Sequence, residues 1–312
     1  MNWKGTMKMK YGNLLKSFIE KNDDYFVLTA ENLGPFHYIR DDIKNNYLDV
    51  GIAEQALMGI SSGLALRGRV PIVHAMSSFL TMRPYEFIRT DIGYPNLNVK
   101  LIGTAAGFLS EDNGPTHQSI EDISLMRTIP NINIFCPSDN SELVNGMKYI
   151  LKDNNPWYVR YNDLEPLYKH SNFSIDTPEV IGSLNAHITV VTYGIMFNEV
   201  LKAKEILEKY NIHICIVNIR VINTINDKIL EKILVNSNII ITVEDHLLFG
   251  GIFSVLSEFN TINNLQSNIV PIALNKNFSP KKLDDLLLKE EFDANSLSKQ
   301  FADIYTKMNR GI

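Results

Sequence analysis

Three short segments hold the residues that are best suited to chemistry. In YLDVGIAEQ (residues 47–55), a strand ends at Gly51 and Glu54 falls in the first turn of the next helix. A carboxylate in that position can hold or release a proton during a reaction. It can equally be a negative charge that the helix dipole stabilises, and this segment alone leaves both interpretations open.

The second segment, SSFLTMRPYEFIR (residues 77–89), contains side chains that suit a pocket. Phe79, Met82 and Tyr85 are spaced by three residues, so they lie on one side of a helical turn. Such a row can line one wall of a pocket for a flat ligand, although it also occurs in ordinary core packing. The segment by itself does not decide between the two.

The third segment, GFLSEDNGPTHQSIED (residues 107–122), gathers Glu111, Asp112, His117 and Gln118 in a loop rich in glycine and proline. It follows a predicted strand, and in open α/β sheets ligands bind at the carboxyl ends of the strands. A loop histidine there can exchange a proton or donate a hydrogen bond to a substrate. It can also be a loop residue whose hydrogen bonds are already satisfied.

The elements that must position these segments form an α/β pattern, because short β-rich runs alternate with amphipathic helices. The length of 312 residues suggests two domains, each a mostly parallel sheet flanked by helices. We expect the first domain over residues 1–172, a linker over 173–186 and the second domain over 187–312. Ser138 is expected to cap a helix, and the predicted strands span residues 25–29, 47–50, 70–75, 98–104, 132–135, 157–161, 187–193, 212–219, 239–243 and 269–274.

Composition argues against several classes of protein. The formal net charge is −5 and no long basic run occurs, so nucleic acid is not an expected partner. No window reaches the ~18 apolar residues of a membrane span, and the N-terminus does not resemble a signal peptide. Cys136 and Cys215 lie in apolar runs and are expected to be buried thiols rather than zinc ligands. The cytoplasm is the default compartment.

Together, the three segments resemble the pyrimidine-binding domain of the transketolase family. GIAEQ, followed by a Gly-Leu-Ala helix, resembles the glutamate motif of that domain, and GPTHQSIEDISLMRTIPNINIFCPSD resembles its substrate loop and the elements after it. Downstream, ITVVTYGIMFNEVLKAKEIL and IIITVEDHLLFGG resemble the C-terminal domain shared by transketolases, deoxyxylulose-phosphate synthases and oxo-acid dehydrogenase β-subunits. The resemblance implies a pyrimidine-binding fold followed by a transketolase C-terminal-like fold.

The resemblance implies a thiamine-diphosphate site. The glutamate that matches Glu54 hydrogen-bonds N1′ of the aminopyrimidine in the family. Phe79 matches an aromatic residue that stacks on this ring, Tyr85 matches a second aromatic residue of the pocket, and Met82 is expected to pack on the same ring through its sulfur. Glu31, in TAENLG, resembles an acidic residue near the cofactor.

The resemblance also implies a place for the substrate. His117 matches a histidine that faces the reactive carbon of the cofactor and hydrogen-bonds an oxygen of the substrate. Arg160, in WYVRYN, aligns with an arginine that binds sugar phosphate at the mouth of the channel, because a guanidinium can donate two parallel hydrogen bonds to phosphate. A surface ion pair is the other interpretation of Arg160.

Two departures from the family pattern concern the substrate. Relatives that act on phosphorylated ketoses carry Thr-His early in the loop, whereas this chain has Thr104 and Ala105. Relatives also carry aspartate just before Gly-Pro, whereas this chain has Asn113, with Asp112 one place earlier. Asparagine still hydrogen-bonds a hydroxyl group but brings no charge. We therefore expect these positions to contact an unusual sugar or acceptor rather than the customary pentose phosphate.

The family motif for the diphosphate is missing. Relatives hold Mg²⁺ and the diphosphate with a Gly-Asp-Gly segment and a later asparagine on another domain, and no Gly-Asp-Gly occurs here. We therefore expect an obligate partner, a diphosphate-binding N-terminal transketolase subunit that carries the Mg²⁺ ligands, in an α₂β₂ assembly. Gly250 and Gly251 could offer amides to a phosphate at a helix start, but a tight strand–helix turn is the expected role.

The resemblance implies transfer of a two-carbon ketol unit from a ketose to an aldehyde. A decarboxylating enzyme is the nearest alternative. GPTHQ argues against an oxo-acid dehydrogenase β-subunit, and the stretch from Thr104 to Gly107 differs from the Asp-Arg-Ala-Gly loop of deoxyxylulose-phosphate synthases. A paralogue that only scaffolds a partner is a third hypothesis, against which the retention of Glu54, Phe79 and His117 argues.

Overall fold

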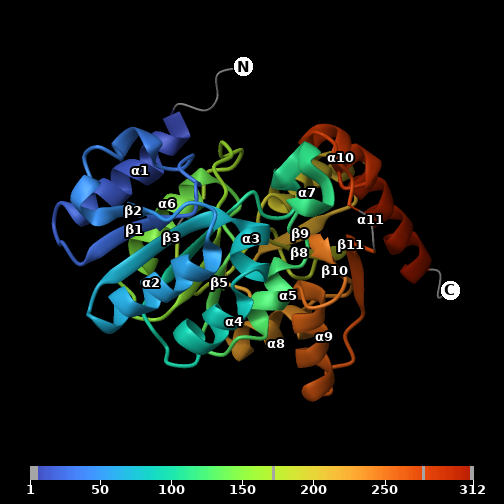
Figure 1. The fold of residues 1–312 in the computed structure, drawn as a ribbon. Helices are drawn as coiled ribbons and strands as arrows, with labels where there is room; N and C mark the ends of the chain where they lie inside the picture. Colours follow the sequence, from blue (N-terminus) through green and yellow to red (C-terminus); the bar gives the residue numbers. More distant parts are fainter. Residues whose placement is uncertain (1–5, 171–172, 276–277, 310–312) are drawn as a thin grey trace.

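The computed structural model describes residues 6–170, 173–275 and 278–309, and it contains two sheets side by side (Figure 1). The first sheet has six strands, all parallel, in the order β2-β1-β3-β4-β6-β5. Its strands are β1 (Tyr25–Thr29), β2 (Tyr47–Asp49), β3 (Val70–Met76), β4 (Lys100–Thr104), β5 (Asn133–Phe135) and β6 (Trp157–Arg160).

The strands of the first sheet are buried on both sides because helices cover both of its faces. Neighbouring residues along a strand point to opposite faces; Val27 lies in one apolar cluster with Tyr11 of α1, whereas Leu28 lies in another with Leu57 of α2. The helices around this sheet are α1 (Thr6–Ile19), α2 (Glu54–Leu66), α3 (Ser77–Met82), α4 (Tyr85–Phe87), α5 (Asp122–Arg127) and α6 (Asn140–Ile150).

The second sheet has five strands in the order β11-β10-β8-β9-β7. All its pairings are parallel except that between β7 and β9, which is antiparallel. The strands are β7 (Glu179–Ile181), β8 (Ile188–Thr192), β9 (Ile214–Asn218), β10 (Ile240–Leu247) and β11 (Ile269–Leu274). The helices are α7 (Met196–Glu208), α8 (Asp227–Asn236), α9 (Ile252–Ile262), α10 (Leu283–Lys289) and α11 (Ala294–Asn309).

The apolar core continues from one sheet to the other. A single cluster of buried side chains contains Leu101 and Met126 from the first sheet and its helices, and Val191 and Leu256 from the second. Because this contact is apolar and continuous, the hydrophobic effect holds the two units together. The loops at the carboxyl ends of the first sheet are thereby fixed against the second.

The predicted α/β class with two mostly parallel sheets is confirmed. Three local predictions differ from the structure. The cap of α6 is Asp139, whose carboxylate accepts hydrogen bonds from the amides of Ser141 and Glu142, rather than Ser138. Strand β7 falls within the segment predicted as linker, and the loop predicted within residues 107–122 contains the 3-10 segment η4 (Phe108–Thr116), which is kinked at Glu111 and Gly114.

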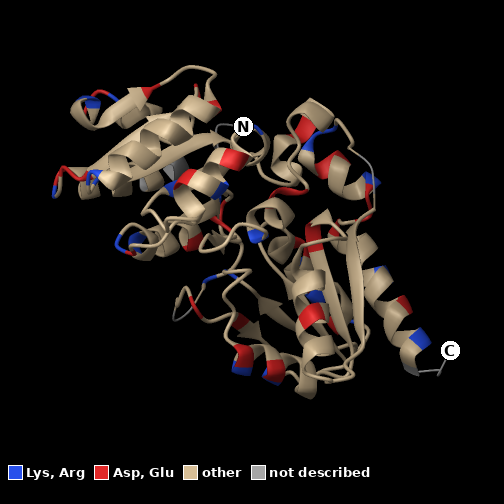
Figure 2. Ribbon diagram, turned by 60° about the horizontal axis from the view of Figure 1, so that its bottom comes forward, with Lys and Arg blue, Asp and Glu red and all other residues tan. Residues whose placement is uncertain are grey.

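Acidic and basic residues are intermixed over many elements, without a long run of one sign in the view of Figure 2. None of the helices in the described part of the chain combines the length and the apolar character needed to cross a bilayer.

Candidate active site

Glu54 is the first residue of α2 and is only 4% exposed. The turn before it is held by Asp49, whose Oδ1 accepts hydrogen bonds from the amides of Gly51 (3.0 Å) and Glu31 (3.1 Å). Gly51 has a φ of 71°, a left-handed conformation that favours glycine. The strand–turn–helix sequence therefore delivers a buried carboxylate to the edge of the sheet and brings the backbone of Glu31 next to the same turn.

Arg83 joins Glu54 to Phe79. Its Nη1 donates a hydrogen bond to Oε1 of Glu54 at 2.8 Å, and its guanidinium carbon lies 3.8 Å from the centre of the Phe79 ring. The other neighbour of that ring is His117, with ring centres 5.0 Å apart and planes at 62°. The structure thus brings three of the predicted residues, Glu54, Phe79 and His117, into one contiguous group.

Arg83 lies inside the segment SSFLTMRPYEFIR (residues 77–89), but it was not predicted as a site residue. It follows Met82 directly and comes four residues after Phe79, a spacing that puts two side chains on one face of a helix. That spacing was the available signal for its contact with Phe79. Its ion pair with Glu54 joins residues 29 positions apart, so only the folded structure reveals it.

Met82 and Tyr85 occupy the helical turns beside Phe79. Met82 is 39% exposed, and the Tyr85 hydroxyl lies 2.5 Å from Oγ1 of Thr128. The hydroxyl contact fixes the Tyr85 ring against the residue that follows α5. The predicted contacts of both side chains with a cofactor ring stay predictions.

His117 is presented at the end of η4, where its amide donates to the carbonyl of Gly114 at 3.1 Å. Its Nδ1 lies 2.7 Å from Oγ1 of Thr116. The next residue, Gln118, is buried and bonds to the backbone of Glu111 and of Ser279. Gln118 therefore pins the loop to the second domain, while His117 stays half-buried beside Phe79.

A second group of predicted residues lines a cavity of about 350 Å³ at the carboxyl ends of β1, β4 and β6. Glu31, Ala105 and Glu111 face this cavity, and all three have a left-handed backbone, with φ of 53°, 55° and 48°. Such strain in residues other than glycine gathers at functional sites. The remaining lining residues are Asn32, Leu33, Gly34, Pro35, Thr104, Leu109, Tyr161, Asp163, Leu164 and Leu283.

Asp112 and Asn113 are exposed on η4. The side-chain amide of Asn113 donates to the backbone carbonyl of Ser110 at 2.7 Å, so it stabilises the turn of its own loop. The predicted role of both residues in reading a substrate stays a prediction.

The interpretation of Arg160 as a surface ion pair is wrong, whereas its predicted role as a phosphate ligand stays a prediction. Arg160 is 5% exposed, and it donates to Asp122 of α5 at 2.9 Å and to Asp245 of β10 at 2.7 Å. Burial opposes its charge, but the two carboxylates raise its pKa well above the ordinary value. Because both pairs are buried, Arg160 is an ionic clasp between the domains rather than a surface pair.

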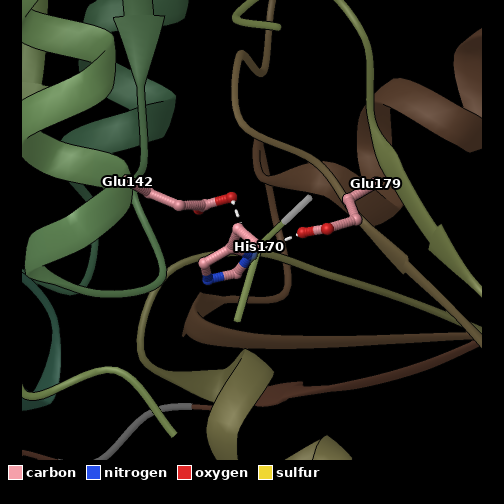
Figure 3. Close-up of side chains that lie close together, drawn as sticks. All are labelled: Glu142, His170 and Glu179. Atoms are coloured by element: carbon pink, nitrogen blue, oxygen red, sulfur yellow. Dashed lines mark hydrogen bonds and ion pairs between the residues drawn. The ribbon is translucent and has the colours of Figure 1, made fainter. Parts of the chain in front are cut away.

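In a second buried charge cluster, His170 of the segment between the two sheets lies between Glu142 of α6 and Glu179 of β7 (Figure 3). Nδ1 of His170 is 2.5 Å from Glu179 and 3.4 Å from Glu142, and its Nε2 is 2.8 Å from Asp139. Burial lowers the pKa of His170, but hydrogen bonds to Asp139 and Glu179 raise it to about 10. Glu142, His170 and Glu179 lie close enough to hold a metal ion, but Arg220 pairs with both glutamates, so the group is a salt-bridge cluster.

Comparison with known families identifies the chain. A model of the transketolase pyrimidine-binding domain matches residues 5–165, and a model of the transketolase C-terminal domain matches residues 179–292. The chain belongs to the transketolase family. Membership implies a transferase, and transketolases and deoxyxylulose-phosphate synthases use thiamine diphosphate.

The relatives include proteins named as a section or a subunit of a transketolase. A protein named as a transketolase C-terminal section from Methanocaldococcus jannaschii is 30% identical over 95% of each chain. A subunit of 6-deoxy-6-sulfo-D-fructose transketolase from Clostridium sp. is 27% identical over 80% of this chain and 78% of its own length. The deoxyxylulose-phosphate synthase of Dictyoglomus thermophilum is 31% identical, but the match covers only 44% of its length.

Solved structures agree with this division. A structure described as a split-gene transketolase in an inactive β4 tetramer superimposes with a TM-score of 0.85 at 27% identity, covering 96% of this chain and 98% of that one. The transketolase of Campylobacter jejuni shares the fold with a TM-score of 0.80 at 19% identity, and this chain spans 46% of its length.

Proposed function

We propose that this chain is the C-terminal, cofactor-activating subunit of a thiamine-diphosphate-dependent transketolase that moves a two-carbon ketol unit from a ketose to an aldehyde. The observation that carries the proposal is the group formed by Glu54, Phe79 and His117. A carboxylate buried to 4% exposure at a helix start, an aromatic face and a loop histidine lie within one set of contacts.

The residues fit a flat heteroaromatic cofactor. Phe79 offers an aromatic face that already accepts a planar cation, the guanidinium of Arg83, and Glu54 offers a buried carboxylate oxygen beside it. When bound, thiamine diphosphate supplies the carbon nucleophile that its family uses. Glu54 would hold a proton against N1′ of the aminopyrimidine, and Phe79 would stack on that ring. His117 would direct its Nε2 toward an oxygen of the substrate and donate to it when that nitrogen is protonated, since its Nδ1 lies against Oγ1 of Thr116.

The missing half of the site is assigned to a partner. The chain has no Gly-Asp-Gly segment, so the Mg²⁺ and diphosphate ligands would belong to a diphosphate-binding N-terminal transketolase subunit in an α₂β₂ assembly. Helix α2 supports this, because Ile60 (37% exposed) and Leu66 (71%) face outward and a Cβ at Gly59 or Gly63 would meet no atom within 4 Å. An exposed apolar helix face of this kind suits a protein contact. The boundaries 1–172, 173–186 and 187–312 stay part of the proposal.

The cavity lining supports a substrate other than the customary pentose phosphate. Glu31, Glu111 and Asp163 bring carboxylates to the cavity, and its described lining contains no lysine or arginine. Ala105 stands where phosphate-using relatives have histidine, and Arg160 is already paired with two aspartates. A sugar whose far end is neutral or positively charged suits this lining better than a phosphate, because like charges repel in a partly desolvated cavity.

A decarboxylating, synthase-like enzyme is the second candidate, favoured by the 31% identity to a deoxyxylulose-phosphate synthase. Co-expression with the diphosphate-binding subunit, followed by a screen of ketose donors and aldehyde acceptors, tests the leading proposal. Ketol transfer that is abolished by Glu54→Gln but kept by Glu86→Gln, an exposed glutamate nearby, would support it. Release of CO₂ from pyruvate would favour the second candidate, and full activity of Glu54→Gln would refute the role of Glu54.

A further inference from the structure

Arg83 makes two contacts that the proposed function would assign to the cofactor. Its guanidinium stacks on Phe79 at 3.8 Å from the ring centre, and its Nη1 donates to Oε1 of Glu54 at 2.8 Å. An aminopyrimidine would stack on the same aromatic face and place a ring N–H on the same carboxylate. One planar group can use this face and this oxygen at a time, so the two occupants exclude each other.

A guanidinium is chemically suited to stand in for the ring. It is planar and delocalised, it stacks on aromatic faces, and it presents N–H donors in its own plane. A protonated aminopyrimidine has the same combination of a flat π-surface and an in-plane N–H. The ion pair also gives the buried Glu54 carboxylate a partner, which matters because an unpaired buried charge is costly.

The position of Arg83 allows it to leave. It is the residue that ends α3, four places after Phe79, and its side chain is 42% exposed. Rotation about its side-chain bonds moves the guanidinium into solvent without any change of the backbone. Phe79 and Glu54 are set by α3 and α2 and keep their places.

We propose that Arg83 is a placeholder that occupies the aminopyrimidine position in the unliganded subunit and is displaced when the cofactor binds. The inference rests on the proposed function of the site. The placeholder lowers apparent affinity, because only the fraction of molecules with Arg83 displaced can accept the ring. The cost is small, because the Arg83 side chain is 42% exposed and the incoming ring replaces it as the partner of the buried Glu54 carboxylate.

The test is a titration of the reconstituted complex with thiamine diphosphate and Mg²⁺, followed by calorimetry in the absence of substrate. Arg83→Gln removes the charge and the stacking, and Arg83→Met keeps only the apolar stem. We expect both to bind the cofactor roughly 3- to 30-fold more tightly than the wild type. Arg89→Gln, a nearby exposed arginine, is the matched control and should bind as the wild type does.

The outcomes separate the two claims. Binding within twofold of the wild type for a folded Arg83 variant would overturn the placeholder, and so would weaker binding, which would make Arg83 a ligand of the cofactor. Either result leaves the proposed function standing. A wild-type complex that binds no thiamine diphosphate would overturn the proposed function, and the placeholder with it.

Discussion

Arg83 and Arg160 both pair with carboxylates near the carboxyl ends of the first sheet, yet they differ in burial. The side chain of Arg83 is 42% exposed and its one ion pair within the described residues is with Glu54, whereas that of Arg160 is 6% exposed and pairs with Asp122 and Asp245. An exposed cation with one ionic partner can be exchanged for a ligand at low cost. A buried cation with two partners cannot, because removing it strands two charges. The comparison separates the proposed binding region around Glu54 from a structural region that uses the same residue types.

The largest effect is expected at the structural arginine. Arg160→Met would leave Asp122 and Asp245 as unpaired buried carboxylates, so the free energy of unfolding should fall by roughly 3–5 kcal/mol. Chemical denaturation of the variant and the wild type measures this difference in the free energy of unfolding. Arg40→Gln, which removes an exposed pair with Asp41, is the control and should change the free energy by less than about 1 kcal/mol. A loss below that value for Arg160→Met would show that the clasp is not structural.

In the proposed binding region, a substitution should lower the turnover rate without changing the free energy of unfolding. His117→Ala removes a proposed donor to the substrate, and we expect the rate of the reconstituted enzyme to fall by roughly 100-fold. The free energy of unfolding should be unchanged, since His117 is half-buried and its ring contacts Phe79 and Thr116. His37→Ala, at an exposed position far along the chain, serves as the control. A rate within threefold of the wild type would remove His117 from the site.

A smaller effect is expected from the second charge cluster, and it depends on pH. The pKa of His170 is about 10 in the folded protein, above the ordinary 6.5. Its contribution to stability is therefore complete below pH 6.5 and is lost as the pH rises through 10. Between these values, stability should decline by roughly 1–3 kcal/mol more in the wild type than in His170→Asn. Parallel pH profiles of the unfolding free energy would contradict the charged state of His170.

Local patterns in the sequence predicted most of the fold. The alternation of β-rich runs and amphipathic helices located the strands of both sheets within a few residues, because each run carries its own burial pattern. Strand β7 escaped prediction because it is defined by a long-range, antiparallel pairing with β9, which stands outside the local alternation of strands and helices. The cap of α6 was misplaced by one residue because Ser138 and Asp139 are both good caps, and backbone geometry decides between them.

The candidate site also contains some residues that the sequence could predict and others that it could not. Glu54, Phe79 and His117 belong to short motifs with fixed positions on helix or loop, so their types and spacing marked them. The role of Arg160 depends on Asp245, 85 residues further along the chain, and no local pattern announces that contact. Long-range ion pairs of this kind follow from packing of one domain on the other.

The central claim, that this subunit activates thiamine diphosphate through Glu54, is tested most directly by the exchange of the cofactor's C2 proton. The reconstituted complex is mixed with deuterium oxide, quenched in acid, and the remaining C2 proton is measured by NMR. We predict exchange that Glu54→Gln slows by at least roughly 100-fold while Glu86→Gln leaves it unchanged. Equal exchange rates in the wild type and Glu54→Gln, with the cofactor bound in both, would contradict the account.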